Sequence, residues 1–90
     1  MSLYVPFDLV PITTAGSAID LMDPGDSGHP KEEMARQIEV VSGSGDLVVV
    51  MQGSGGAART LPATEGKIYY GFFKSITADT TTALDLIVGY

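Results

Sequence analysis

The chain has 90 residues, one histidine and no cysteine, so it is long enough for one domain and offers neither a disulfide nor a cysteine-based zinc site. The formal net charge is −6 and the five basic residues are dispersed, which disfavours binding to the phosphates of nucleic acid. The most hydrophobic run, residues 47–51, is far shorter than the roughly 20 residues of a membrane helix, so no membrane partner is expected.

Residues 1–34 are expected to form an extended N-terminal arm and a turn-rich loop. Residues 4–12 contain two prolines, which cannot both donate to a central sheet ladder, and therefore predict an edge strand or an extended arm. Residues 18–22 are a candidate for a short strand. Residues 23–30 are rich in Asp, Pro and Gly and predict a long loop, and residues 31–36 have room for one helical turn at most.

The middle of the chain predicts two strands. Residues 36–41 alternate apolar and polar side chains, as in a half-buried strand. Residues 42–45 supply two glycines for a turn, and residues 46–52 form a second extended segment, so the two strands are expected to pair as a β-hairpin. The second strand is apolar on both faces, which is typical of a central strand covered on both sides.

Further strands are predicted after this point. The glycine-rich residues 53–56 are expected to form a hairpin turn, and residues 58–61 a short strand that ends at Pro62. Residues 67–76 form an aromatic-rich strand, in which Gly71 indicates a bulge or a close approach of the backbone to a neighbour.

The spacing of turns decides the expected architecture. Residues 83–90 again alternate apolar and polar positions, and turn signals recur about every 8–12 residues, as in β-sandwiches and barrels. The sequence therefore predicts a single all-β domain, a small antiparallel β-sandwich or barrel over residues 35–90, preceded by the arm and loop of residues 1–34.

One motif has the letters of a catalytic site. Gly25-Asp26-Ser27-Gly28 matches the residues around the nucleophile of trypsin-like serine proteases, but the only histidine, His29, lies two residues after the serine in a turn-rich loop. Serine protease chemistry needs a separately positioned histidine base and a buried aspartate to orient it. A structural turn is the expected role, with no catalytic residue; an enzyme completed by a metal or a second subunit remains an alternative.

An acidic cluster is the only candidate for a cation site. Asp20, Asp23 and Asp26, with Glu32 and Glu33, carry oxygen ligands that calcium prefers. Their spacing does not match the twelve-residue loop that arranges such ligands around calcium. We therefore expect a solvated acidic loop, with no metal site and no cofactor, and leave cation binding by the loop open.

Four aromatic residues are concentrated in one strand: Tyr69, Tyr70, Phe72 and Phe73. Since neighbouring strand residues point to opposite faces, Tyr69 and Phe73 share one face and Tyr70 and Phe72 the other. Only one face can belong to the core, so we expect the other to be a subunit interface, where aromatic residues are enriched. A carbohydrate-stacking platform over residues 69–73 and an ordinary surface are the alternatives.

Residues 35–90 also contain short pieces in a particular order. The pieces are Ala35-Arg36-x-Ile38-x-Val40, Gly45-Asp46-Leu47-Val48-Val49, Gly55-Gly56, Leu61-Pro62 before Gly66, and Asp79-Thr80-Thr81-Thr82-Ala83 before Leu86-Ile87-Val88. In this order they resemble small virion proteins of tailed bacteriophages and gene transfer agents, which decorate the head or form the base of head spikes. The strand at residues 67–73 departs from that pattern, which usually has a less aromatic strand there.

The resemblance implies a function in assembly. It implies a jelly-roll-like sandwich that assembles as a homo-oligomer, in particular a trimer, on a capsid, and that is located in the virion after synthesis in the host cytoplasm. Such a subunit needs no active site and uses an extended arm to bind its neighbours, a role that residues 4–10 suit. The expected interface residues are Tyr4, Phe7, Leu9, Tyr69, Tyr70, Phe72 and Phe73.

Overall fold

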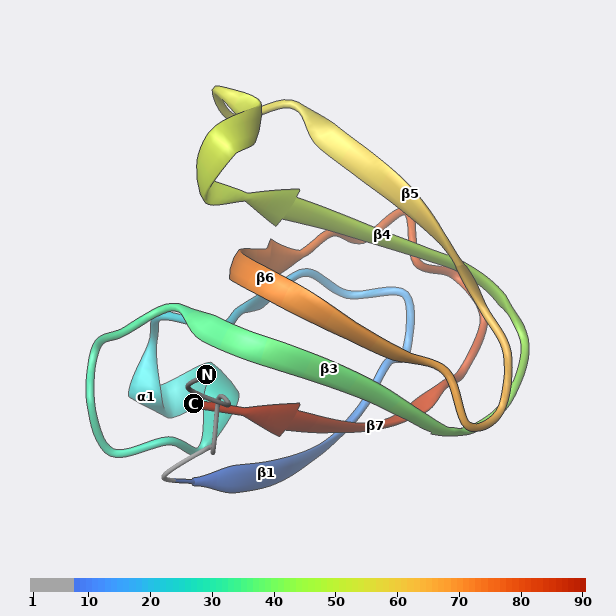
Figure 1. Cartoon of the computed structure of the whole chain (residues 1–90), viewed down its shortest axis with the longest axis horizontal. Coiled ribbons are helices and arrows are strands. Elements are labelled where there is room, and N and C mark those ends of the chain that lie inside the picture. The colour runs from blue at the N-terminus through green and yellow to red at the C-terminus, as the bar shows by residue number, and fades with distance from the viewer. Residues whose placement is uncertain (1–7) are drawn as a thin grey trace, which may run out of the picture.

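The structure is a computed structural model that describes residues 8–90 and consists mainly of antiparallel strands (Figure 1). Its elements are β1 (Leu9–Thr13), β2 (Ile19–Asp20), α1 (Pro24–Ser27), β3 (Ala35–Ser42), β4 (Gly45–Met51), the 3₁₀ turn η1 (Gln52–Ser54), β5 (Ala58–Ala63), β6 (Ile68–Ile76) and β7 (Asp85–Gly89). The all-β prediction is confirmed. Tyr4 and Phe7, two of the expected interface residues, lie outside the described residues.

The strands belong to one sheet in the order β1-β7-β3-β6-β4-β5, with the short strand β2 also paired to β6. In Figure 1, β4 and β5 lie on one side of β6, and β3, β7 and β1 on the other. β1 and β2 come from the first 34 residues and join the same sheet as the rest of the chain. The edge-strand alternative for residues 4–12 is therefore confirmed for the part that lies in β1.

The predicted hairpin of the middle region is wrong. β3 and β4 do not pair with each other: β3 pairs with residues 68–73 of β6 and β4 with residues 73–76. The glycines that suggested a hairpin turn have another role, because a β-carbon at Gly43 would lie 2.9 Å from a Leu84 methyl group, and one at Gly45 would lie 2.7 Å from the Thr82 hydroxyl oxygen. They allow close packing against residues 82–84, while β3 pairs with β6 and β7, and β4 pairs with β6 and with the next strand, β5.

Gly71 lies at a bulge of β6, as predicted. Tyr70 pairs with Gln37 and Phe73 with Ala35, so β6 uses one more residue than β3 over this stretch. A β-carbon at Gly71 would lie 2.5 Å from the terminal methyl group of Met51, so the backbone also approaches a neighbour closely. Figure 1 shows the ribbon of β6 turning sharply in its second half, which lets the strand pair with β3 first and with β4 later.

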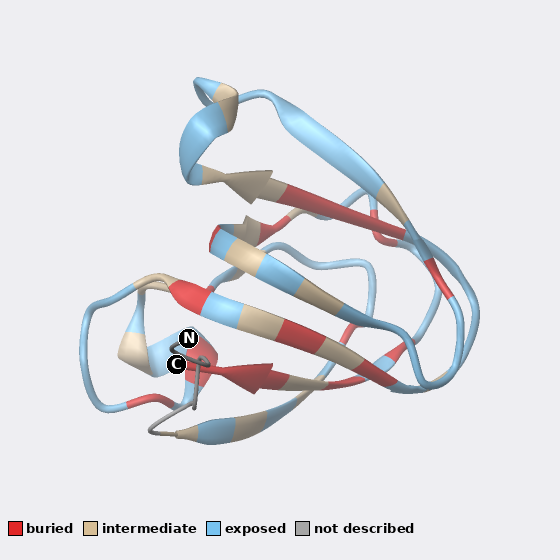
Figure 2. Ribbon diagram, in the orientation of Figure 1, coloured by how far each residue is buried: buried red, intermediate tan, exposed pale blue. Residues whose placement is uncertain are grey.

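The core lies on the inner face of the curled sheet. Figure 2 shows its buried residues mainly on β3, β4 and β7, alternating with more exposed positions on β3 and β7. The alternation predicted for residues 36–41 and 83–90 is confirmed, and so is the two-sided burial of the β4 residues Leu47, Val48 and Val49. The buried cluster consists of Leu21, Ala35, Ile38, Val40, Leu47, Val49, Ala63, Phe73, Ile76, Leu84, Leu86, Val88 and Tyr90.

Two local predictions need correction. β5 does not end before Pro62 but continues through it to Ala63, because β5 is an edge strand and a proline there costs no ladder bond on its open side. The predicted loop at residues 23–30 contains the one-turn helix α1. Within residues 8–90, no helix is long and apolar enough to cross a membrane.

Candidate functional site

The structure divides the expected interface residues of β6 between two faces. Phe73 is buried in the core and Tyr69 packs against it, whereas Tyr70 is 65% exposed and Phe72 is 48% exposed. This is the division predicted from the alternation of strand residues. Leu9 on β1 is 54% exposed. The structure therefore leaves Leu9, Tyr70 and Phe72 on the surface and assigns Tyr69 and Phe73 to the domain's own packing.

The exposed residues of β1 and β6 share one face of the sheet. Leu9 pairs with Gly89, and Gly89 also pairs with Gln37. Gln37 pairs in turn with Tyr70, so one row of cross-strand partners runs from β1 to β6. Side chains of directly paired residues point to the same side of a sheet. Leu9 and Tyr70, which are 61 positions apart in the sequence, therefore lie on the same surface.

A second row runs beside the first. Pro11 pairs with Ile87, and Ile87 pairs with Glu39. Glu39 pairs with Ile68, which is 38% exposed. We call the surface formed by these two rows and the adjacent Phe72 the outer face; its side chains are Leu9, Pro11, Gln37, Glu39, Ile68, Tyr70, Phe72 and Ile87.

One corner of the outer face is hollowed. Arg36, Tyr70, Gly71 and Phe72 line a shallow, mainly apolar depression of about 320 Å³. The guanidinium carbon of Arg36 lies 5.8 Å from the centre of the Phe72 ring, within the range of a cation–π interaction. Gly71, at the bulge, contributes only backbone to the lining. The depression can accept an apolar group, and the arginine adds a positive charge at its edge.

The second notable region is built by the loop around α1. The Asp23 side chain accepts a hydrogen bond from the N–H of Gly25 and caps the helix, and Gly28 ends it with a left-handed conformation at φ 78°. The Ser27 hydroxyl oxygen then accepts a hydrogen bond from the N–H of His29. These turn residues position His29 so that its side chain points into the protein, where it is 4% exposed.

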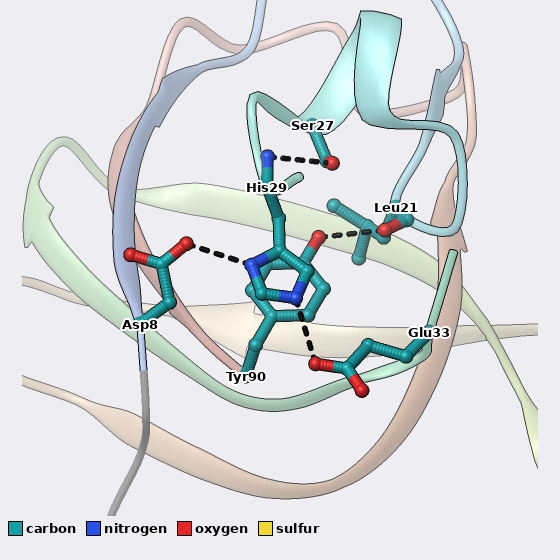
Figure 3. A network of polar contacts seen from close by, with 6 residues as sticks. All are labelled: Asp8, Leu21, Ser27, His29, Glu33 and Tyr90. Carbon is teal, nitrogen blue, oxygen red and sulfur yellow. Dashed lines mark hydrogen bonds and ion pairs between the residues drawn. The ribbon is translucent and has the colours of Figure 1, made fainter. Parts of the chain in front are cut away.

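His29 is held on both sides by carboxylates (Figure 3). Its Nδ1 lies 2.7 Å from Asp8 Oδ2, and its Nε2 lies 2.7 Å from Glu33 Oε1. The ring stacks on Tyr90, with 4.0 Å between ring centroids and an interplanar angle of 7°. The Tyr90 hydroxyl donates to the carbonyl oxygen of Leu21 at 2.6 Å. We call these residues the His29 cluster; it joins the C-terminal residue Tyr90 to three segments of the first 33 residues.

The geometry assigns the protonated state to His29. Both ring nitrogens contact carboxylate oxygens, and both can donate only when the imidazole carries two protons. Burial alone would lower the pKa of His29, but the hydrogen bonds and the negative charges of Asp8 and Glu33 outweigh burial and raise it above 6.5. A doubly protonated imidazole cannot accept a proton, so His29 in this arrangement offers no base to Ser27.

The acidic loop uses its carboxylates for backbone hydrogen bonds. Asp20 accepts from the N–H of Met22, and Asp26 accepts from the N–H of Asp20. In the part of the chain that the structure describes, no group of three or more His, Cys, Asp or Glu side chains is arranged to hold a metal ion. In the described residues, these hydrogen bonds hold the backbone conformation of the loop between β2 and His29.

Sequence reasoning missed the His29 cluster. Glu33 follows His29 by four residues, a spacing that predicts a side-chain contact in a helix, but no helix is found there and the two side chains meet in a loop. Asp8 and Tyr90 reach His29 only because β1 and β7 pair at the edge of the sheet, where the N–H of Tyr90 donates to the carbonyl oxygen of Asp8. A single histidine in a loop carries no signal for such a partner set.

Comparison with protein families, curated proteins and solved structures finds no match for this chain. Its function is therefore argued from the geometry of the outer face and the His29 cluster.

Proposed function

We propose that this chain is a structural subunit of a tailed-bacteriophage or gene-transfer-agent particle, a capsid decoration or head-spike-base protein. In this proposal it folds as a jelly-roll-like sandwich with an N-terminal arm, assembles as a homotrimer and binds the capsid. It is made in the host cytoplasm and ends in the virion. Support comes from the all-β fold and from the order of short pieces in residues 35–90 that resembles such proteins.

The observation that carries the proposal is the exposure of Tyr70 and Phe72 on the outer face. Large apolar side chains grouped on the surface of a small soluble domain mark a binding surface, because burying each ring against a partner is favourable by roughly 2 kcal/mol. Aromatic residues are also enriched where proteins meet proteins. A subunit that acts by assembly needs such a surface and no catalytic group.

The chemistry of the His29 cluster favours binding over hydrolysis. Both nitrogens of His29 contact carboxylates, and the Ser27 hydroxyl oxygen accepts a backbone N–H. Neither residue is arranged as a nucleophile with its base, so the cluster supports a structural role. The net charge of −6 likewise supports protein rather than nucleic acid as the partner.

The test is to look for the chain in particles. Particles released by the source organism are banded on a density gradient and digested with trypsin, and mass spectrometry is used to detect the peptide of residues 68–74, which lies between two lysines. We expect the peptide to band with the major capsid protein and to remain after a high-salt wash. Its recovery only in the soluble fraction of cells that do release particles would show that the chain is not a virion subunit.

A carbohydrate-binding module is the second candidate, favoured by the hollow beside Tyr70 and Phe72. Aromatic rings beside a shallow hollow can stack on the apolar face of a sugar ring. This candidate predicts a monomer that binds particular glycans on an array, with binding lost in Tyr70→Ala and kept in Tyr70→Phe. The virion proposal predicts no glycan binding that depends on Tyr70.

A further inference from the structure

We propose that the outer face packs against a second copy of this chain, an inference that rests on the self-association contained in the proposed function and names the surface responsible. The register of β1, β7, β3 and β6 places Leu9, Ile68 and Tyr70 on one surface. Its opposite side is the core, with Ile38 and Val88 fully buried. The sheet thus has one apolar face packed by its own chain and a second one that the described residues leave exposed.

The area of the outer face fits a protein–protein contact. The exposed parts of Leu9, Ile68, Tyr70 and Phe72 together amount to roughly 400 Å² of apolar surface, in the range of a functional patch. A standard interface buries about 800 Å² per partner, of which somewhat more than half is apolar. The outer face by itself therefore presents about the apolar area that one side of a stable dimer or trimer contact requires.

The charge of the outer face points to another copy of the same chain. The whole chain carries −6, so two copies repel each other over most of their surfaces. The outer face contains one acid, Glu39, and has one base, Arg36, beside Phe72 at its edge, and Asp85 at its end adds a second acid, so this region carries little of the net charge. At its end, Thr13 and Ser42 donate hydrogen bonds to Asp85 and form a polar rim. Copies that meet through this face therefore bring few of their acidic groups together.

The edge of the sheet beside the outer face is poorly suited to assembly by strand addition. The N–H of Tyr90 donates to the carbonyl oxygen of Asp8, and the N–H of Thr14 donates to the carbonyl oxygen of Leu84. The even-numbered residues of the β1 segment therefore direct their backbone N–H and C=O groups toward β7. The odd-numbered residues of β1 direct their backbone groups away from β7, to the open edge of the sheet, and Pro11, one of them, has no N–H to donate. A second copy gains more from the apolar face than from the edge of β1.

The first experiment changes the charge of the face. Tyr70→Glu should raise the dissociation constant of the self-associated protein about 30-fold or more, measured by sedimentation equilibrium, because it places a charge in the buried contact. Thr60→Glu, an equal change of charge at an exposed residue of the edge strand β5, is the control and should leave the constant unchanged. Circular dichroism verifies that both variants are folded.

The second experiment uses the absence of cysteine. Gln37→Cys places a single thiol in the middle of the outer face, and Thr60→Cys places one far from it as the control. A spin label on residue 37 should report a short distance between copies, and a label on residue 60 a longer one or none. A dimer and a trimer with this result both support the inference.

Three outcomes separate this inference from the proposed function. If Tyr70→Glu leaves self-association unchanged and the label at residue 37 reports no short distance, the inference is overturned. The copies then associate through another surface. A monomer at high micromolar concentration overturns the inference, while the particle experiment still decides virion location. Association through the outer face in a chain that is absent from particles supports the inference and overturns the virion proposal.

Discussion

The outer face and the His29 cluster differ in which kind of side chain they expose and which they bury. The outer face exposes apolar side chains such as Tyr70, whose burial requires something beyond the described chain. The His29 cluster buries a polar ring and satisfies both of its nitrogens within the chain. A patch of exposed apolar groups is typical of a binding surface, whereas a buried polar group with complete hydrogen bonding is typical of a contact that stabilises the fold. The two regions therefore differ in that one is open to a partner and the other stabilises the chain itself.

The strongest test of this contrast removes the ring at the centre of the cluster. His29→Leu leaves Asp8 and Glu33 without their shared donor, and we expect the free energy of unfolding to fall by about 2–3 kcal/mol. Urea denaturation of the purified chain measures the loss. Lys31→Ala, at an exposed position beside the same cluster, is the control and should change stability by less than about 0.5 kcal/mol. An equally small effect of His29→Leu would contradict the structural role.

A smaller effect is expected at the bulge that shapes the corner of the outer face. Gly71→Ala places a methyl group against the end of the Met51 side chain, and shifting that flexible side chain should cost about 1 kcal/mol. The control is Gly53→Ala, because a β-carbon there meets no atom within 4 Å. The same urea midpoints report both variants. If Met51→Val does not reduce the cost of Gly71→Ala, the close approach to Met51 is not its cause.

The smallest expected effect is a pH dependence of the stability, which we expect from the His29 cluster. The pKa of His29 is raised above 6.5 in the folded chain, so the folded state keeps a proton that the unfolded state releases above that pH. The stabilisation is complete below about pH 6.5 and is lost as the pH rises through the folded pKa. We expect the urea midpoint to decline across this range in the unmodified chain and not in His29→Gln. A slope that persists in His29→Gln would assign the effect to another group.

The fold was predictable where the signal is local. Alternation identified β3, β7 and the division of β6 into an inner and an outer side, and Gly71 marked its bulge. The pairing of β3 with β4 was predicted wrongly, because two strand-forming runs joined by glycines look the same whether they pair with each other or with a third strand. β6 separates them, and it lies 17 residues or more further along the chain. Local pattern carries no information about that choice.

The sequence alone determined the all-β class, which residues share a face in β3, β6 and β7, and the surplus of aromatic side chains in one strand, because these follow from a two-residue period and from side-chain chemistry. Only the tertiary structure decided that Tyr70 and Phe72 are the outward pair and that Leu9, already expected at an interface, lies on the same surface, since that depends on the register of β1, β7, β3 and β6. The His29 cluster was decided in the same way, because its partners Asp8 and Tyr90 come from near opposite ends of the chain. Such contacts form only when strands distant in the sequence pair, and no period along the chain records them.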